Sequence, residues 1–377
     1  MQAREKSGPD FRRWLLYCAA PENTFMRLCF VVNSVRTQRP TYTTAHLAFA
    51  AVRRGHEVAF VSVDALSLGQ GNDGEVFGEL VRPKAKRARD VATYIKGLTD
   101  TSAPREVGRL NGFDVVFLRN NPSAGRRDGD NGDNHNPALD FGRRLKNAGV
   151  MVINDPDGLT RAGSKMYLAG FPVELRPRTL ITRSLERVRG FLRELDGPAI
   201  IKPLAGFGGK NVFFVDRGQT ANLAQMISTV RRDGYVIVQE YLPAAAKGDK
   251  RVLLVGGAVC KVGDVVAAYR RMRPKDDIRN NMHVGGSRKR STFSEAEARV
   301  CDLLRPRVVA DGLYFVGVDI VGGKVLEINV FAPGGIHNIN ELYGIDVGSE
   351  IIRHLERRVE LRALHGDRFP PHVLMRA

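Results

Sequence analysis

The segment from Gly317 to Val330, GVDIVGGKVLEINV, constrains the fold more than any other part of the chain. Two apolar, strand-like runs flank Gly322 and Gly323, and this pattern predicts an antiparallel β-hairpin. Because successive residues of a strand point to opposite faces, Glu327 and Asn329 share one face of the second strand while apolar residues occupy the other. The hairpin is therefore predicted to have one polar face and one core face.

The loop between the two runs decides whether Asp319 joins the polar face. A strict two-residue Gly-Gly turn would put Asp319 on the opposite face from Glu327, whereas a three-residue loop or a glycine bulge places the two carboxylates directly opposite each other. Two carboxylates and the carboxamide of Asn329 form a hard-oxygen set suited to magnesium, which completes its coordination with water and nucleotide phosphates. The alternative is a solvated hairpin face, and this segment alone does not decide between the two.

A second segment, Ala199 to Val215 (AIIKPLAGFGGKNVFFV), combines a strand with a glycine-rich loop. Lys202 lies where the strand ends, and glycines let backbone N–H groups approach a phosphate. The spacing does not fit the Walker A pattern, and a strand follows where that pattern requires a helix. The alternative to a phosphate-binding loop is a structural glycine hairpin, which is the commoner reading of such a segment taken alone.

A third segment begins at Val238 and reads VQEYLPAAAKGDKRVLL. Its first strand ends in alternating polar and apolar residues, which can present backbone donors and acceptors to a purine while Leu242 covers the ring. Asp249 is a candidate acceptor for ribose hydroxyls, and Arg251 is a candidate contact for phosphate or a developing oxyanion. Residues 243–248 otherwise form an ordinary loop, so this segment is not specific by itself.

Around these segments, the apolar pattern predicts two folding units. In the first, strands at 27–33 and 57–63 flank a helix at 43–54, and strands at 114–118 and 150–153 flank a helix at 138–147. Alternating strands and helices predict a small open parallel sheet of the α/β class.

The second unit is predicted to be α+β. Its expected elements are helices at 163–169, 185–195, 220–232 and 294–311, strands at 199–202, 212–215, 235–240 and 251–255, the hairpin, and a basic loop at 270–290. Ser294 and Glu297 form a capping box, which predicts a helix start there. We divide the chain into a poorly ordered extension (1–25), an N-terminal domain (26–155), a second domain (156–360, with subdomains at about 160–242 and 243–360) and a C-terminal tail (361–377).

The excess of 58 Lys and Arg over 41 Asp and Glu gives a net charge of +17, which is compatible with a nucleic-acid partner. The basic residues are spread along the chain, however, without a helix-turn-helix or aromatic-interleaved pattern, and an anionic small substrate needs only a local positive cleft. A nucleic-acid role is therefore disfavoured. No apolar run approaches the ~18 residues of a membrane span, and the four cysteines form no C-x-x-C pair, so we expect a cytoplasmic protein without a membrane partner.

The order of the three segments resembles that of the ATP-grasp ligases, and specifically that of the bacterial glutathione synthetases. The resemblance runs from about Met26 to Glu360 and is strongest in IKPLAGFGG from residue 201, QEYLPAAAKGDKRVL from residue 239 and VGVDIVGGKVLEINV from residue 316. It implies a pre-ATP-grasp α/β domain with a small open parallel sheet, followed by an α+β ATP-grasp fold.

The resemblance also implies roles for individual residues. The implied metal ligands are Asp319, Glu327 and Asn329, with magnesium as the ion and manganese as the alternative. The implied ATP contacts, from the phosphates to the adenine and ribose, are Lys165, Lys202, Gly206, Gly208, Gly209, Gln239, Glu240, Tyr241, Leu242 and Asp249. The implied catalytic residues, from a central strand and a loop that covers the reacting groups, are Arg251, Arg271, Arg279 and Asn281.

Enzymes of this family transfer the γ-phosphate of ATP to a carboxylate, and an amine then attacks the acyl phosphate through a tetrahedral intermediate. The resemblance thus implies an ATP- and magnesium-dependent ligase without a protein nucleophile, in which lysines and arginines neutralise charge and loop closure excludes water. For a glutathione synthetase, the acid is γ-glutamylcysteine and the amine is glycine. A homo-oligomer is also implied.

Two departures from the family pattern leave the substrates open. Residues 330–335 read VFAPGG where the family has a Thr-Ser-Pro type stretch, so a hydroxyl is missing beside the site. The stretch RNNPS at Arg119–Ser123 loosely matches the family's acidic, proline-rich loop, and the segment 120–136 is an unusual insert that we expect to be a surface loop. The alternatives are an ATP-grasp ligase for another amino acid or peptide pair, such as a glutamate-adding or natural-product ligase, and a non-catalytic nucleotide- or nucleic-acid-binding protein.

Overall fold

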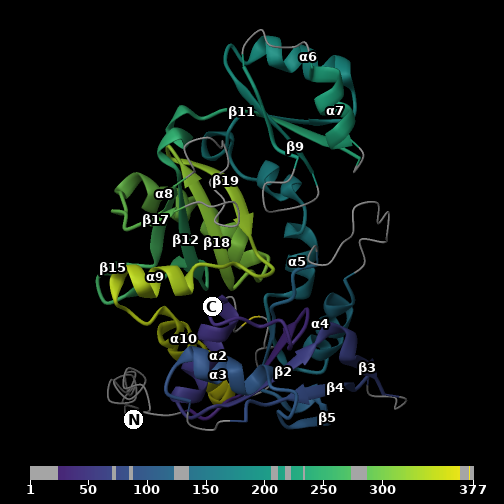
Figure 1. Ribbon diagram of the computed structural model, residues 1–377, viewed down its shortest axis with the longest axis vertical. Helices are drawn as coiled ribbons and strands as arrows, with labels where there is room; N and C mark the ends of the chain where they lie inside the picture. Colours follow the sequence, from purple (N-terminus) through teal and green to yellow (C-terminus); the bar gives the residue numbers. More distant parts are fainter. Residues whose placement is uncertain are drawn as a thin grey trace, which may run out of the picture.

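The computed structural model of the chain describes residues 24–69, 74–84, 88–122, 136–204, 211–216, 222–231, 234–272, 287–365 and 373. Within them, three larger sheets follow one another along the long axis of the molecule (Figure 1). Several predicted features lie outside the described residues: residues 1–23 of the extension 1–25, most of the insert 120–136, the glycine loop with Gly206, Gly208 and Gly209, and the covering loop with Arg279 and Asn281.

The N-terminal sheet has the strand order β3-β4-β2-β1-β6-β7, with β5 paired to the outside of β4. Its strands are β1 (Arg27–Val32), β2 (Glu57–Ser62), β3 (Leu66–Leu68), β4 (Val76–Val81), β5 (Arg105–Arg109), β6 (Val115–Leu118) and β7 (Met151–Ile153). The pairs β1–β2, β1–β6 and β6–β7 are parallel, as predicted, whereas β3, β4 and β5 pair antiparallel. The sheet is therefore mixed, since residues 66–109 add antiparallel strands that were not predicted. Among these strands, β3 has only three residues and most of β5 is exposed, so neither gives a clear apolar period in the sequence.

Helices cover both faces of this sheet. They are α2 (Thr43–Arg53), α3 (Val91–Thr99), α4 (Pro137–Asn147), α5 (Pro156–Ala162) and α10 (Val347–His365), with 3₁₀ turns η1 (Val63–Ala65) and η2 (Leu110–Gly112). Phe30 and Phe117 pack in a cluster with α2, α3 and α10, while Val31 and Leu118 pack in a second cluster with α4. Because neighbouring residues of β1 and β6 are buried on opposite faces, these strands read as continuous apolar runs.

The second sheet is small and antiparallel, with the order β10-β9-β11-β8. Its elements are β8 (Thr179–Thr182), α6 (Leu185–Glu194), β9 (Ala199–Pro203), β10 (Phe213–Val215), α7 (Leu223–Arg231) and β11 (Val236–Glu240). Val188, Ile201 and Ile227 belong to a core that is separate from the other two clusters. The helix predicted at 163–169 is instead a 3₁₀ segment, η3 (Lys165–Gly170), followed by η4 (Val173–Leu175). The short α5 before it was not predicted.

The third sheet lies between the other two in Figure 1 and has the order β17-β16-β12-β18-β19, with β13 paired to β12. Its strands are β12 (Asp249–Val255), β13 (Ala258–Val259), β16 (Ala268–Met272), β17 (Ser287–Lys289), β18 (Phe315–Val321) and β19 (Lys324–Asn329); β14 (Lys261–Val262) and β15 (Val265–Val266) pair separately. The connecting helices are η5 (Pro243–Lys247), α8 (Glu295–Ala310) and α9 (Ile336–Tyr343). Both ends of the predicted basic loop 270–290 are strands, β16 and β17. The capping box of α8 is confirmed, since Ser294 and Glu297 bond each other reciprocally.

Polar contacts join the third sheet to the N-terminal domain. The Asn154 side chain, after β7, donates to the carbonyl oxygens of Phe315 and Val330 and accepts from the N–H of Phe315. Glu356 on α10 binds Arg54 and the buried His56 near the start of β2. The Asn154 contacts place the carboxyl end of β7 beside the third sheet, whereas the Glu356 contacts hold α10 at the amino end of β2. None of the described helices combines the length and the apolar character needed to cross a membrane.

Candidate active site

The predicted polar face of the hairpin is confirmed, but by a different device from the one expected. Gly322 and Gly323 have φ values of 56° and 78°, and Val321 pairs with Lys324, so the turn is a tight two-residue one of the kind that only residues with positive φ form readily. The register shifts between Asp319, which pairs with Glu327, and Ile320, which pairs with Val325. Leu326 is therefore an extra residue in β19. The predicted irregular Gly-Gly loop is wrong, and a bulge inside the strand brings the two carboxylates face to face.

Asp319 is held by two guanidinium groups. It lies opposite Arg251 of β12 and accepts from Arg251 Nε at 2.5 Å and Nη2 at 2.9 Å. Arg271 Nη2 of β16 is 2.8 Å from the same carboxylate. Burial opposes the ionisation of Asp319, but the charges and hydrogen bonds of the two arginines outweigh it and lower its pKa. The side chain is thus a buried carboxylate anion at neutral pH.

Arg271 connects Asp319 to a second buried carboxylate. Asp249 lies opposite Arg271 across the β12–β16 pair and accepts from its Nε at 2.8 Å and its Nη2 at 2.5 Å. Burial raises the pKa of Asp249 in spite of this ion pair. The predicted ribose contact and two predicted catalytic arginines therefore belong to one network, Asp249–Arg271–Asp319–Arg251, which runs across three adjacent strands.

The oxygen donors at this edge fit a hard divalent cation. Asn329 lies beside Asp319, with Nδ2 3.2 Å from its Oδ2. The side chain of Glu327 makes no hydrogen bond or ion pair with the described residues, so its carboxylate is available as a ligand. Magnesium bound together with a nucleotide needs only one or two carboxylates, because phosphates and water complete its shell. A cation bound here would take over part of the charge compensation that Arg251 and Arg271 provide to Asp319.

The two predicted phosphate-binding lysines both interact electrostatically with Glu327, although they belong to other parts of the chain. Lys202 Nζ donates to Gln239 Oε1 at 2.9 Å, and Lys165 Nζ donates to the carbonyl oxygen of Leu204 at 3.3 Å. Burial lowers the pKa of Lys202 to about 8, against the attraction of Glu327. Burial also lowers the pKa of Lys165, again opposed by Glu327. The two desolvated lysines, Lys165 and Lys202, are thus both attracted to the carboxylate of Glu327 in β19.

The predicted adenine linker leaves the last strand of the second sheet. The backbone N–H groups of Glu240 and Tyr241 donate to the carbonyl oxygens of Arg178 and Pro198, so neither N–H is available to a purine. The Glu240 carboxylate binds Lys324 at 2.8 Å. The Tyr241 ring packs edge-on against Phe214, with 5.2 Å between ring centroids, and Leu242 begins the turn η5. The linker therefore connects the second sheet to the hairpin of the third through a salt bridge.

One residue near the site was not among the predicted ones. Arg119 follows β6, is buried, and donates from Nη2 to the carbonyl oxygen of Pro333 at 3.1 Å. The next carbonyl group of that loop, at Gly334, accepts from Arg251 Nη1 at 3.0 Å. The signal that points to Arg119 is its place at the carboxyl end of a parallel strand, the edge at which open α/β sheets bind ligands.

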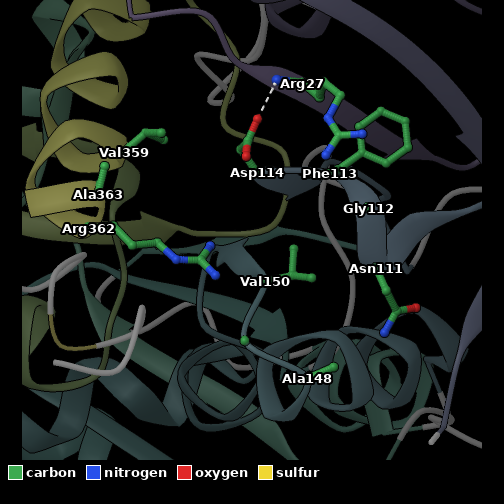
Figure 2. A pocket seen from close by; sticks show the side chains of 11 residues that line it. Arg27, Asn111, Gly112, Phe113, Asp114, Ala148, Val150, Val359, Arg362 and Ala363 are labelled. Atoms are coloured by element: carbon green, nitrogen blue, oxygen red, sulfur yellow. Dashed lines mark hydrogen bonds between the residues drawn. The ribbon is translucent and has the colours of Figure 1, made fainter. Parts of the chain in front are cut away.

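A pocket of about 420 Å³ lies elsewhere, at the amino ends of β1, β6 and β7. Figure 2 shows Arg27, with its backbone N–H bonded to Asp114, and Arg362 of α10 pointing toward the same space. None of the predicted site residues lines it. Because it lies at the opposite edge of the sheet from Arg119, we do not assign it to the site.

Comparison with known proteins identifies the family. Models of the prokaryotic glutathione synthetase N-terminal domain and of the prokaryotic glutathione synthetase ATP-grasp domain match residues 26–160 and 164–344. Glutathione synthetase from Synechocystis sp. is 33% identical, with 88% of this chain and 100% of the relative covered. The enzyme of that name from Synechococcus elongatus is also 33% identical, with 89% and 99% covered.

Solved structures share the fold at lower sequence identity. The D-cycloserine synthetase DcsG superposes with a TM-score of 0.59 at 17% identity, with 88% of this chain and 99% of that chain covered. The ATP-grasp ligase PsnB, in complex with a precursor variant, Mg and ADP, gives 0.57 at 19% identity, with 89% and 99% covered. These structures confirm the predicted α/β domain followed by an ATP-grasp fold. The family models and the glutathione synthetase relatives confirm the predicted ATP-dependent ligase. The chain belongs to the prokaryotic glutathione synthetase family.

Proposed function

We propose that this ligase is a magnesium-dependent glutathione synthetase that joins γ-glutamylcysteine to glycine. The observation that supports the proposal most directly is the pairing of Asp319 with Glu327 beside Arg251 and Arg271. It puts two possible metal ligands and two cations on one sheet face, opposite the lysines that interact with Glu327. The relatives named glutathione synthetase, which align over most of the chain, support the choice of substrates.

The residues of the chain divide the work of phosphoryl transfer between them. Lys165 and Lys202 would bind the ATP phosphates, because each is a desolvated cation that gains from an anionic partner. Asp319 and Glu327, with Asn329, would hold magnesium. The ion would supply neutralisation of the charge on the nucleotide phosphates. No side chain needs to act as a nucleophile, since positioning and electrostatic stabilisation provide the catalysis.

Arg251 and Arg271 would stabilise charge as it develops on the reacting carboxylate. Both guanidinium groups are oriented by buried carboxylates, Asp319 and Asp249, and Arg251 is also fixed by the carbonyl oxygen of Gly334. Preorganised donors of this kind are most effective where water is excluded. We also keep Arg279 and Asn281, outside the described residues, as proposed contributors to the loop that covers the acyl phosphate.

The direct test is an assay of purified protein with ATP, magnesium, γ-glutamylcysteine and glycine. We expect ADP and glutathione in equal amounts, and no glutathione when any one component is omitted. Release of ADP without glutathione, even with both substrates in excess, would exclude these substrates and leave the ligase class standing.

A second candidate is an ATP-grasp ligase for another acid and amine. It is favoured by the loop that follows Asn329, in which Phe331 and Ala332 precede Pro333 where the family pattern has Thr and Ser, so that a hydroxyl is missing beside the site. The assay distinguishes the two candidates when γ-glutamylcysteine and glycine are replaced in turn by other dipeptides and amino acids, and the pair with the highest kcat/KM identifies the substrates.

Two further expectations accompany the proposal. We expect the enzyme to act in the cytoplasm, where thiols stay reduced, and Cys29, Cys260 and Cys301 are free and buried. We also expect a homo-oligomer. Light scattering coupled to size-exclusion chromatography would contradict the latter if the molar mass were that of one 41.7 kDa chain.

A further inference from the structure

Arg119 is a buried cation to which the described residues supply no anionic partner. Its guanidinium lies against the rings of both Phe117 and Phe315, whose centroids are 5.6 and 5.4 Å from Cζ. Nε donates to Thr44 Oγ1 at 3.1 Å and Nη2 donates to the carbonyl oxygen of Pro333. Nη1 is buried and has no hydrogen-bond partner. Among the described residues, Arg119 forms no ion pair, and it is only 5% exposed.

This arrangement differs from that of the other buried arginines of the site. Arg251 and Arg271 each form a two-point contact with a carboxylate. Removing an ion from water costs several kcal/mol unless it is paired and fully hydrogen-bonded. Burial alone lowers the pKa of Arg119 to about 9, so the group remains a cation at neutral pH. A hydroxyl, a carbonyl group and two aromatic faces compensate this cost only in part.

The position of Arg119 relates it to the reaction without placing it at the reacting atoms. It lies at the carboxyl end of β6, which pairs in parallel with β1. Arg119 and Arg251 bind the carbonyl oxygens of consecutive residues, Pro333 and Gly334, from the two domains. Because Arg251 also binds Asp319, the loop 331–335 separates Arg119 from the proposed phosphoryl-transfer edge. A substrate group bound by Arg119 would therefore be a neighbour of the reacting centre, not part of it.

We propose that Arg119 binds a non-reacting carboxylate of a substrate. Within the proposed function, on which this inference rests, that group is either the α-carboxylate of the γ-glutamyl moiety or the carboxylate of glycine. A carboxylate on Nη1 would supply the missing acceptor and the missing negative charge together. Since Nη1 is shielded from solvent, binding requires the surrounding side chains to move.

The test combines substrate analogues with variants of Arg119. The acid arm compares γ-glutamylcysteine with the analogue whose α-carboxylate is a carboxamide, and the amine arm compares glycine with glycinamide. For the wild type, we expect kcat/KM for the carboxamide analogue to be lower than that for the unmodified substrate by a factor on the order of 100, in the arm whose carboxylate Arg119 binds. In Arg119→Met, kcat/KM for the unmodified substrate should fall by a similar factor, whereas kcat/KM for its carboxamide analogue should fall less than about threefold. The preference for the carboxylate over the carboxamide is then lost in that arm alone.

Arg54→Met is the matched control, because Arg54 is ion-paired with Glu356 away from the site and its removal should leave both discriminations intact. If Arg119→Met does not fold, Arg119→Lys keeps the charge but not the planar guanidinium whose other nitrogens fix the direction of Nη1, and it should lose part of the discrimination in the same arm. Full discrimination in an active Arg119 variant would overturn the inference, as would a wild type that accepts both carboxamides as well as the true substrates. Absence of glutathione formation by the wild type with unmodified substrates would instead overturn the proposed function, and this inference with it.

Discussion

Asp319 lies directly opposite Glu327 in the β18–β19 hairpin because Leu326 is an extra residue between the tight Gly-Gly turn and the carboxylate. In a regular two-residue hairpin, Asp319 would face Leu326, and the two carboxylates would be on opposite faces of the sheet. The bulge also brings Glu327 to the side on which Arg251 and Arg271 bind Asp319. The local geometry of one strand thus determines whether the polar edge can serve as a metal site.

Replacement of Glu327 should abolish catalysis without unfolding the protein. Glu327 is partly exposed and its side chain makes no hydrogen bond or ion pair with the described residues, so Glu327→Ala should cost no more than about 1 kcal/mol in the free energy of unfolding, through the weaker attraction to Lys165 and Lys202. Loss of a metal ligand should reduce kcat on the order of 1,000-fold or more. Steady-state kinetics and urea denaturation measure the two effects, with the exposed Glu295→Ala as the control. Near-normal turnover in Glu327→Ala would refute the metal assignment.

The lowered pKa of Lys202 predicts proton uptake when ATP binds. In the free protein, Lys202 loses its proton as pH rises through about 8, whereas an ordinary lysine does so near 10.5. A bound phosphate favours the charged form, so ATP binding should take up about half a proton at pH 8 and almost none at pH 6.5. Calorimetric titrations in two buffers of different ionisation enthalpy give this number.

Lys202→Arg is the control for that measurement, since an arginine remains protonated throughout the range. The variant should bind ATP without proton uptake at pH 8. Equal uptake by the wild type and the variant would show that another group is responsible.

Removal of the guanidinium between Asp249 and Asp319 should destabilise the protein. Arg271→Met leaves Asp249 without its cation inside the sheet, at an expected cost of about 3 kcal/mol in the free energy of unfolding. The double variant Asp249→Asn with Arg271→Met should recover at least half of this loss, because it removes the stranded charge, but it should not recover activity. Urea denaturation of the two single variants and the double variant tests the coupling. Strictly additive effects would contradict it.

The packing of α5 against the C-terminal end of α8 allows no side chain at Gly158. A Cβ atom there would lie 1.9 Å from the carbonyl oxygen of Asp311, so Gly158→Ala should cost about 3 kcal/mol or prevent folding. Gly190 in α6 offers the matched control, since the nearest atom to its Cβ position is 3.9 Å away. Gly190→Ala should raise stability by about 0.5–1 kcal/mol through the higher helix propensity of alanine. Thermal unfolding of both variants provides the measurement, and equal stability of the two would contradict the packing argument.

Local patterns were enough to predict much of the secondary structure. Buried strands at β1, β2 and β6, the helices α2 and α6, the capping box of α8 and the β18–β19 hairpin follow from the apolar period, the positions of glycine and the capping residues. Short edge strands such as β3 and β5 have too few buried residues to produce a periodic signal. The 3₁₀ form of η3 could not be predicted either, because the apolar spacing of a short segment differs little between helix types.

The candidate site also has a part that the sequence predicted and a part that it did not. The sequence determined that Glu327 and Asn329 could share a strand face, because alternation is a property of the strand itself. Only the tertiary structure decided that Asp319 would lie against Arg251 and Arg271, that Leu326 would be bulged, and that Arg119 would be buried beside Pro333. Apart from the bulge, those relationships join residues tens to hundreds of positions apart, and their energies depend on strand order, register and the exclusion of water. No local pattern contains that information, since it arises when the separate elements pack together.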